Sequence, residues 1–171
     1  IMDYFNVIGE EEFQLSNQRP VPCKRSADYS NINYLLSLFR YRSLEKNVET
    51  AIDFNKRITK KEEKFEDAFG NLSEEVVKGV YAHCQYTMFK IFIDNVNSQK
   101  DEKLKLAMRR VAIVYGLTQI LDDNWGEVVN NEQFKLIRSC LTQTLDELRP
   151  DAIGLVDAFD FPDTVLKSTI G

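Results

Sequence analysis

Residues 101–121, DEKLKLAMRRVAIVYGLTQIL, decide the predicted fold. Asp101 is a good N-cap residue, because its carboxylate can accept hydrogen bonds from the free N–H groups of a first helical turn. No charged side chain occurs from Val111 to Leu121. A helix that is apolar around most of its girth is buried on several sides, so we expect this helix to be the central one of a bundle. Its apolar positions are Leu104, Met108, Val111, Ala112, Tyr115 and Leu121.

Two helices are predicted before this segment. Ser30 is a candidate N-cap for a helix of about 30 residues, roughly 45 Å long, that ends in the charged run of residues 60–64. Its apolar positions are Ile32, Leu35, Leu36, Phe39, Val48, Ile52 and Ile58. After Gly70, Asn71 and Glu74 have capping-box spacing. The stripe that follows comprises Val76, Val77, Val80, Tyr81, Cys84, Met88, Ile91 and Phe92, and such a stripe normally faces the core.

A fourth helix and a short fifth helix are predicted after the central segment. Residues 122–126 form a turn, and Asn130 with Gln133 has capping-box spacing. The apolar positions of the fourth helix are Phe134, Ile137, Leu141, Leu145 and Leu148, with Cys140 alongside. Pro150 suits the first position of the short helix, and Pro162 is expected to stop it.

These elements predict an all-α fold, an antiparallel helical bundle of four main helices plus a short C-terminal helix. We expect residues 30–171 to form one helical domain. Residues 1–29 lack helical periodicity and contain Gly9, Pro20 and Pro22, so they are predicted to be an irregular lead-in segment.

Composition narrows the class of partner. The 171 residues suggest one domain, and 43% hydrophobic with 29% charged residues is typical of a globular protein. The net charge of -5 argues against nucleic acid, because phosphate binding needs a basic face. No apolar run approaches the roughly 20 residues that span a bilayer.

Cysteine and histidine spacing argues against a metal site. Cys23, Cys84 and Cys140 are far apart, and His83 is the only histidine. Adjacent residues of a helix point about 100° apart, so His83 and Cys84 are poorly placed to share one metal. His83 as a catalytic base lacks an adjacent Ser or Asp partner in sequence, so a hydrogen-bonded histidine at the core boundary is the favoured interpretation.

Aromatic and glycine residues leave two interpretations open. Trp125 and Tyr115 are interpreted as core residues, although they could stack on a flavin or nucleotide. Gly116 and Gly154 lie inside helical patterns, where glycine costs about 1 kcal/mol relative to alanine. Close approach of another helix is the usual reason for such a glycine, and approach of a ligand is the rarer one.

Three carboxylates, Asp157, Asp160 and Asp163, recur near the predicted end of the last helix. Negative charge is unfavourable at a helix C-terminus, so these groups require compensation. Spacing of three would place Asp157 and Asp160 on one helix face if the helix extends that far. We favour acceptance of hydrogen bonds from N–H groups or arginines over cation binding or acid–base chemistry. The sequence contains no complete catalytic triad, phosphate loop or nucleotide fingerprint.

Several ordered motifs resemble the C-terminal helical domain of the peroxisomal acyl-CoA oxidase family. Ala82-His83-Cys84-Gln85-Tyr86 is similar to that family's Ala-His-Cys-x-Tyr, and Tyr115-Gly116-Leu117 is similar to its Tyr-x-Leu-Tyr-Gly region. The last similar stretches, from Arg149 to the C-terminus, comprise Arg149, Asp151, Ala152, residues 155–161 with Asp157, Phe159, Asp160 and Phe161, and then Ser168 and Gly171.

The resemblance implies an enzyme that uses FAD to desaturate fatty acyl-CoA to trans-2-enoyl-CoA, with O2 reduced to H2O2, in peroxisomal fatty-acid β-oxidation. The resemblance also implies a homodimer. It favours an oxidase over a dehydrogenase, because the related acyl-CoA dehydrogenases lack this second helical domain. The family's general-base glutamate belongs to a Glu-Gly-x-Asn type motif that this sequence does not contain. We therefore expect a piece of a longer protein that packs on the catalytic half and is not catalytic alone.

Departures from the family pattern limit what can be transferred. Pro150 replaces a residue that is more often polar, and residues 1–29 match poorly. The family's later Tyr-Asp-Gly-x-x-Tyr-Glu type segment and its peroxisomal targeting tripeptide do not occur in this sequence. Peroxisomal localisation therefore rests on the resemblance.

Two alternatives stay open. In the first, the chain is a non-enzymatic helical interaction or dimerisation module related to this domain. In the second, the bundle itself contacts the adenine of the flavin or the acyl-CoA, and Asp157 or Asp160 contributes to cofactor retention.

Overall fold

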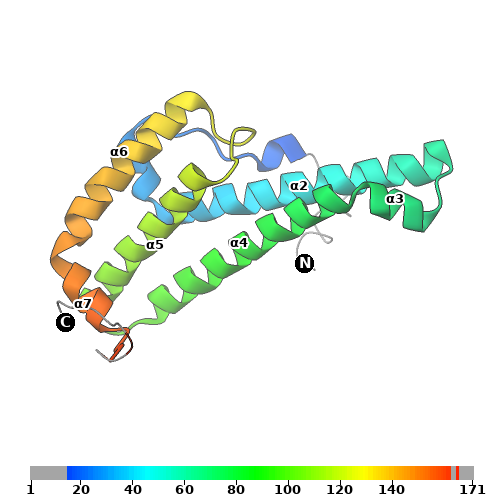
Figure 1. Cartoon of the computed structure of the whole chain (residues 1–171). Coiled ribbons are helices and arrows are strands. Elements are labelled where there is room, and N and C mark those ends of the chain that lie inside the picture. Colours follow the sequence, from blue (N-terminus) through cyan, green and yellow to red (C-terminus); the bar gives the residue numbers. More distant parts are fainter. Residues whose placement is uncertain (1–14, 163–164, 166–171) are drawn as a thin grey trace.

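The computed structural model describes residues 15–162 and residue 165 (Figure 1). Its α-helices are α2 (Ile32–Lys61), α3 (Phe65–Asn71), α4 (Ser73–Ser98), α5 (Glu102–Asp122), α6 (Asn131–Leu148) and α7 (Ala152–Asp157). The 3-10 helices are η1 (Leu15–Gln18), η2 (Ser26–Ser30) and η3 (Arg149–Asp151). No strand occurs among the described residues, so the all-α prediction is confirmed. None of the helices in this part of the chain is long and apolar enough to cross a membrane.

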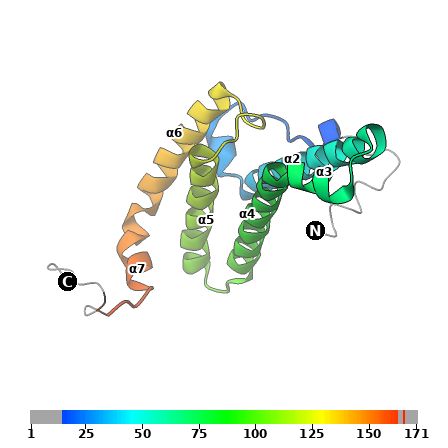
Figure 2. The same ribbon diagram turned by 45° about the vertical axis from the view of Figure 1, so that its right-hand side comes forward.

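Helix α5 is the centre of the bundle, as its apolar girth predicted. The long helices α2, α4, α5 and α6 alternate in direction along the chain (Figure 1). Helix α5 packs on α2, α4 and α6, and it lies between α4 and α6 in Figure 2. Helix α4 packs mainly on α2 and α5, with α3 at its N-terminal end. It is therefore an edge helix, and one of its sides has no helix against it in the described chain.

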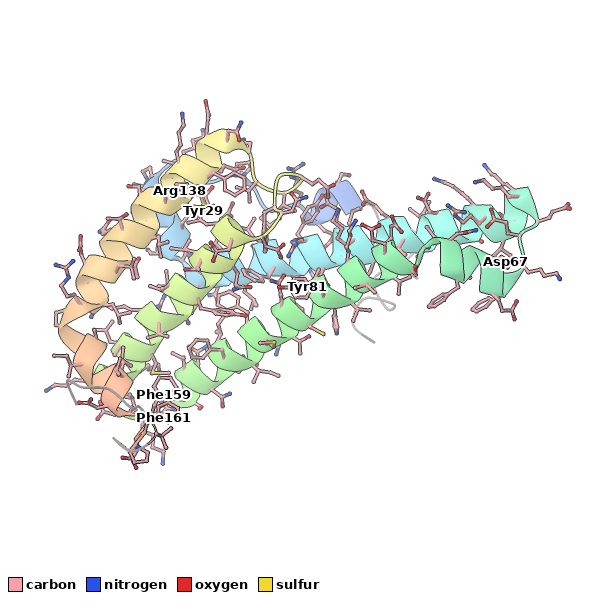
Figure 3. The ribbon with its side chains drawn as sticks, in the orientation of Figure 1. Tyr29, Asp67, Tyr81, Arg138, Phe159 and Phe161 are labelled. Atoms are coloured by element: carbon pink, nitrogen blue, oxygen red, sulfur yellow. The ribbon has the colours of Figure 1, made fainter. Side chains whose placement is uncertain are left out.

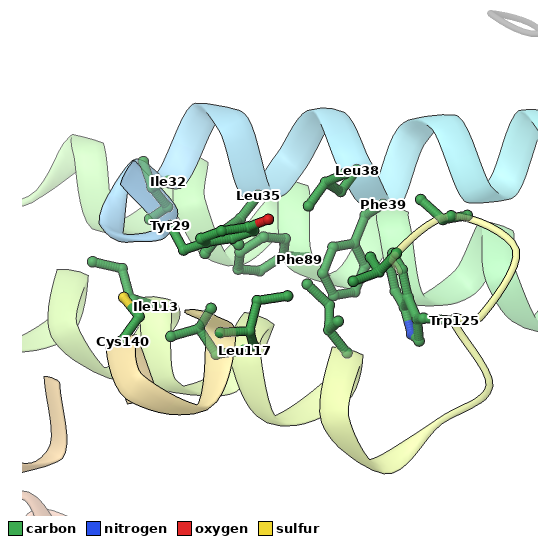
Figure 4. Close-up of a cluster of buried hydrophobic side chains, with 14 of the residues drawn as sticks. Tyr29, Ile32, Leu35, Leu38, Phe39, Phe89, Ile113, Leu117, Trp125 and Cys140 are labelled. Atoms are coloured by element: carbon green, nitrogen blue, oxygen red, sulfur yellow. The ribbon is translucent and has the colours of Figure 1, made fainter. Parts of the chain in front are cut away.

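An aromatic and aliphatic core fills the space between α2, α4, α5 and α6 (Figure 4). The ring centroid of Phe39 lies 4.8 Å from those of both Phe89 and Trp125. Trp125 is buried, as the core interpretation predicted, and Tyr29 is buried although it lies in the segment predicted to be irregular. Full burial of each large apolar side chain stabilises the fold by roughly 1.5–3 kcal/mol.

Two of the four predicted N-caps of the main helices are confirmed. Asp101 Oδ1 accepts hydrogen bonds from the backbone N–H groups of Lys103 and Leu104. Asn130 and Gln133 form the predicted reciprocal capping box, with hydrogen bonds of 2.9 and 2.8 Å.

The other two predicted caps are wrong, although α2 and α4 begin within two residues of them. Asn31, not Ser30, caps α2, because the Ser30 hydroxyl donates to the Ala27 carbonyl at 2.7 Å. Asn71 ends the unpredicted helix α3 and its amide donates to Glu63, so α4 begins after Leu72 without a side-chain cap. The rings of Phe65 and Phe69 stack at this end of the molecule, and Phe65 also packs against Phe54 of α2 at 5.2 Å. These contacts favour a short helix where the sequence indicated only a break.

The C-terminal helix is shorter than predicted. Pro150 lies at the start of η3 as expected, but α7 ends at Asp157, before Pro162. Asp160 has a φ of 49°, in the left-handed region, so Asp157 and Asp160 do not share a helix face. Asp163 lies outside the described residues, as do Ser168 and Gly171.

The two helical glycines differ in environment. A Cβ on Gly116 would lie 2.9 Å from Phe89 Cζ, so close approach of α4 explains this glycine as predicted. A Cβ on Gly154 would meet nothing within 4 Å, so the same explanation is wrong for Gly154.

Candidate functional site

Most of the predicted apolar stripe of α4 faces solvent rather than the core, and only Val76 and Phe92 of its eight residues are partly buried. Val77 is 66% exposed and Met88 is 59% exposed. We define the α4 face as the exposed residues at this spacing, which are Val77, Val80, Tyr81, Cys84, Met88 and Ile91. Their separations of three and four residues place them on one side of the helix. Figure 3 labels Tyr81, which lies in the N-terminal half of this helix.

The residues on the buried side of α4 explain why the sequence pattern predicted the wrong side of this helix to face the core. The buried side is lined by Gly79, Ala82, Gln85, Phe89, Ile93 and Val96. Gly79 lies against Asn47 of α2, whose amide donates to the Gly79 carbonyl at 3.1 Å. Small residues at this contact let α2 approach closely, and a glutamine occupies the inner side because it has polar partners there. Hydrophobicity alone therefore identifies the wrong side of this helix.

A polar network that sequence reasoning missed fixes the rotation of α4. Arg42 of α2 donates to Gln85 of α4 and to Asp123, with 3.0 Å to the Asp123 carboxylate. The Gln85 amide also donates to Gln119 of α5 at 2.8 Å. The Arg42 guanidinium lies over the Trp125 ring, 4.6 Å from its centroid. No sequence pattern distinguishes Arg42 from its charged neighbours Arg40 and Glu45.

Charged residues flank the α4 face in pairs. Lys78 contacts Glu74 at 2.6 Å on one flank, and Lys90 contacts Asp94 at 2.8 Å on the other. Each pair joins opposite charges four residues apart, so the flanks carry no net charge. An apolar strip with a neutral polar rim resembles the anatomy of a protein interface.

The family-motif residues of α4 and α5 are built into the helices. His83 is half-buried, with Nε2 3.5 Å from the Thr87 hydroxyl, and burial lowers its pKa. Tyr86 and Tyr115 are partly buried against the core, and the Tyr115 ring packs on Phe89 at 5.8 Å. Gly116 provides the close helix contact. These positions support packing rather than catalysis.

The C-terminal motif residues lie on a different part of the surface. Asp151 contacts Arg110 of α5 at 3.6 Å, and Arg149 contacts Asp146 at 3.4 Å. The exposed rings of Phe159 and Phe161 stack with centroids 5.8 Å apart (Figure 3). The prediction concerned Asp157, Asp160 and Asp163, and neither Asp157 nor Asp160 has an arginine or N–H partner for its side chain among the described residues. The ion pair of Asp151 was not predicted.

An apolar hollow lies beside this C-terminal stretch. It has a volume of about 350 Å³ and is lined by Met108, Val111, Leu155, Ala158 and Phe159. The side chains of Ile153 and Val156 nearby in sequence are also exposed. The stretch from Ile153 to Phe161 is therefore a second exposed apolar surface, separate in sequence from the α4 face.

One buried carboxylate lies outside both surfaces. The hydroxyl of Tyr41 donates to Glu45 Oε1 at 3.0 Å, and both side chains are buried. Glu45 Oε2 is buried without a hydrogen-bond partner. Burial raises the pKa of Glu45 above its ordinary value.

Two hollows among the described residues lack the features of a complete FAD site. The pyrophosphate of FAD needs cations or free N–H donors, and the hollow beside Phe159 has only apolar walls. A second hollow of about 210 Å³ contains Arg42, Lys46 and Lys78, but each contacts a carboxylate already. Its volume is also below the roughly 300–1,000 Å³ typical of ligand pockets. No group of His, Cys, Asp and Glu suited to a metal ion occurs within the described residues.

A comparison with protein families assigns the chain. The family model for acyl-CoA oxidase matches residues 31–171. The chain belongs to the acyl-CoA oxidase family. This confirms the resemblance carried by the motifs around His83, Tyr115 and Arg149.

Curated relatives of this acyl-CoA oxidase chain are much longer. It is similar to bovine peroxisomal acyl-coenzyme A oxidase 1, with 32% identity over 110 residues that span 62% of this chain and 17% of the relative. The mouse protein of the same name is 26% identical over 175 residues, which span 100% of this chain and 26% of the relative. The chain thus spans about a quarter or less of the length of these relatives.

Solved acyl-CoA oxidases share the fold. The tomato enzyme matches with a TM-score of 0.78 and 22% identity over 94% of this chain and 24% of that structure. Acyl-CoA oxidase-1 of Caenorhabditis elegans, complexed with FAD and ATP, matches with a TM-score of 0.75 and 21% identity over 96% of this chain and 24% of that structure.

Proposed function

We propose that this chain is the C-terminal helical domain of an FAD-dependent acyl-CoA oxidase. The whole enzyme desaturates fatty acyl-CoA to trans-2-enoyl-CoA and reduces O2 to H2O2 in peroxisomal β-oxidation, as a homodimer. The family match over residues 31–171 carries this proposal. The peroxisomal names of the bovine and mouse relatives support the compartment.

In this proposal the domain supplies structure rather than chemistry. The hollows described above do not fit a whole FAD, and the sequence lacks a Glu-Gly-x-Asn type motif for the general base. The flavin supplies the redox chemistry of the complete enzyme, and the part of the enzyme outside this chain holds it. Two exposed apolar surfaces support a role in packing on that catalytic half.

Hydrogen peroxide production tests the proposal. The intact polypeptide that contains this segment is supplied with a fatty acyl-CoA in air, and both enoyl-CoA and H2O2 are measured. We expect the two products in equal amounts. An intact protein that forms neither product and binds no flavin would support the non-enzymatic interaction module instead.

A further inference from the structure

We propose that the α4 face docks an amphipathic helix from the catalytic half of the same polypeptide. This inference rests on the proposed function and adds to it the surface that makes the contact. The six side chains of the α4 face run from Val77 to Ile91, a length of about 21 Å at 1.5 Å per residue. The polar network around Arg42 and Gln85 holds this face outward.

The shape of the α4 face suits a helix. Its residues are separated by three, four and seven positions. Side chains at these separations form the ridges and grooves by which two helices pack together. The small side chain of Cys84 lies one turn from the larger side chains of both Tyr81 and Met88. A facing helix with apolar residues at the same spacing fills such a surface.

The charge and area of the α4 face favour an intrachain partner. The charged residues beside the α4 face already form the pairs Lys78–Glu74 and Lys90–Asp94. The α4 face therefore suits an apolar partner better than a charged one. The largest exposed apolar patch on a typical monomer covers about 300–600 Å². A stable dimer needs about 800 Å² from each partner, whereas a tethered helix avoids most of the entropic cost of association. The relatives contain the additional chain from which such a helix can come, since this segment covers 26% of the mouse protein.

Cys84 provides a direct test because it is free and exposed at the centre of the α4 face. The intact native enzyme is treated with iodoacetamide, and the labelling rate at each cysteine is measured by peptide mass spectrometry. The same enzyme unfolded in denaturant provides the reference rate. We expect native Cys84 to be labelled at least ten times more slowly than in the unfolded enzyme. Cys140, buried inside the bundle, is the protected control.

A second measurement identifies the occupant. A short thiol-to-amine crosslinker is attached at Cys84 of the intact enzyme under partly destabilising conditions, then allowed to react after native conditions are restored. The proposal predicts a crosslink to a peptide outside this segment, in a product of monomer mass. Fast native labelling of Cys84, or a product of dimer mass, overturns it.

The two proposals fail in distinguishable ways. A flavin-containing, active enzyme with an open Cys84 contradicts the docking surface alone. An inactive, colourless protein with a protected Cys84 contradicts the oxidase proposal and leaves the docking contact supported.

Discussion

The guanidinium of Arg42 in α2 lies 3.0 Å from the carboxylate of Asp123, the residue that follows α5. Arg42 is buried, whereas the Asp123 side chain is 30% exposed, so the pair is only partly screened by solvent. The Gln85 side chain accepts a hydrogen bond from Arg42 and donates one to Asp123. These hydrogen bonds link α2, α4 and the turn after α5. This network determines which side of α4 is buried.

Replacing Arg42 should therefore destabilise the fold. We expect Arg42→Ala to lower the free energy of unfolding by about 2–3 kcal/mol, because it leaves buried polar partners unpaired and removes packing on Trp125. Arg149→Ala is the matched control, since its exposed pair with Asp146 contributes little. Urea unfolding of both variants measures the difference. Equal stability of the two variants would show that the network does not hold α4.

The two helical glycines provide an opposed pair of substitutions. Gly116→Ala should lower the free energy of unfolding by about 1–3 kcal/mol, because the new Cβ would crowd Phe89. Gly154→Ala should be neutral or stabilising by up to about 1 kcal/mol, because its site is open and alanine favours helix. Thermal unfolding followed by circular dichroism measures both changes. A stabilising Gly116→Ala would contradict the close helix contact.

The two candidate caps of α2 can be separated in the same way. Asn31→Ala should cost about 1 kcal/mol, because Asn31 Oδ1 accepts from the N–H groups of Asn33 and Tyr34. Ser30→Ala should have the smaller effect, since Ser30 does not cap the helix. Chemical denaturation of the two variants ranks them, and the reverse order would favour Ser30 as the cap.

Glu45 should make stability depend on pH. Its folded pKa is raised by burial, so the native state holds this proton to higher pH than the unfolded state does. The contribution of Glu45 to stability therefore falls as pH rises from its ordinary pKa through its folded pKa. Glu45→Gln should be more stable than the parent at neutral pH, and the difference should shrink toward pH about 4. Unfolding curves across this range measure it, and a constant difference would contradict the raised pKa.

The central helix and two caps were predictable because each depends on local sequence. The apolar run after Arg110 indicated α5, and Asp101 and Asn130 have the side chains that cap helices. The orientation of α4 depends instead on Gly79 and on polar partners far apart in sequence. Helix α3 depends on a ring contact between Phe54 and Phe65 that no local pattern indicates.

The candidate site was predictable only in part. The motif positions were read from the sequence, but the ion pair of Asp151 with Arg110 was not predicted. Asp157, Phe159 and Asp160 could not be placed, because α7 ends early and Asp160 adopts a left-handed backbone. The stripe of α4 was recognised, but its outward direction follows from which helices lie beside it.

An anaerobic titration of the intact protein with a fatty acyl-CoA tests the oxidase proposal most directly. We expect the visible absorption of an oxidised flavin to bleach as substrate is added, and to return when O2 is admitted with release of H2O2. A protein without flavin absorption, or a reduced flavin that O2 does not reoxidise, would contradict the assignment of this chain to an active acyl-CoA oxidase.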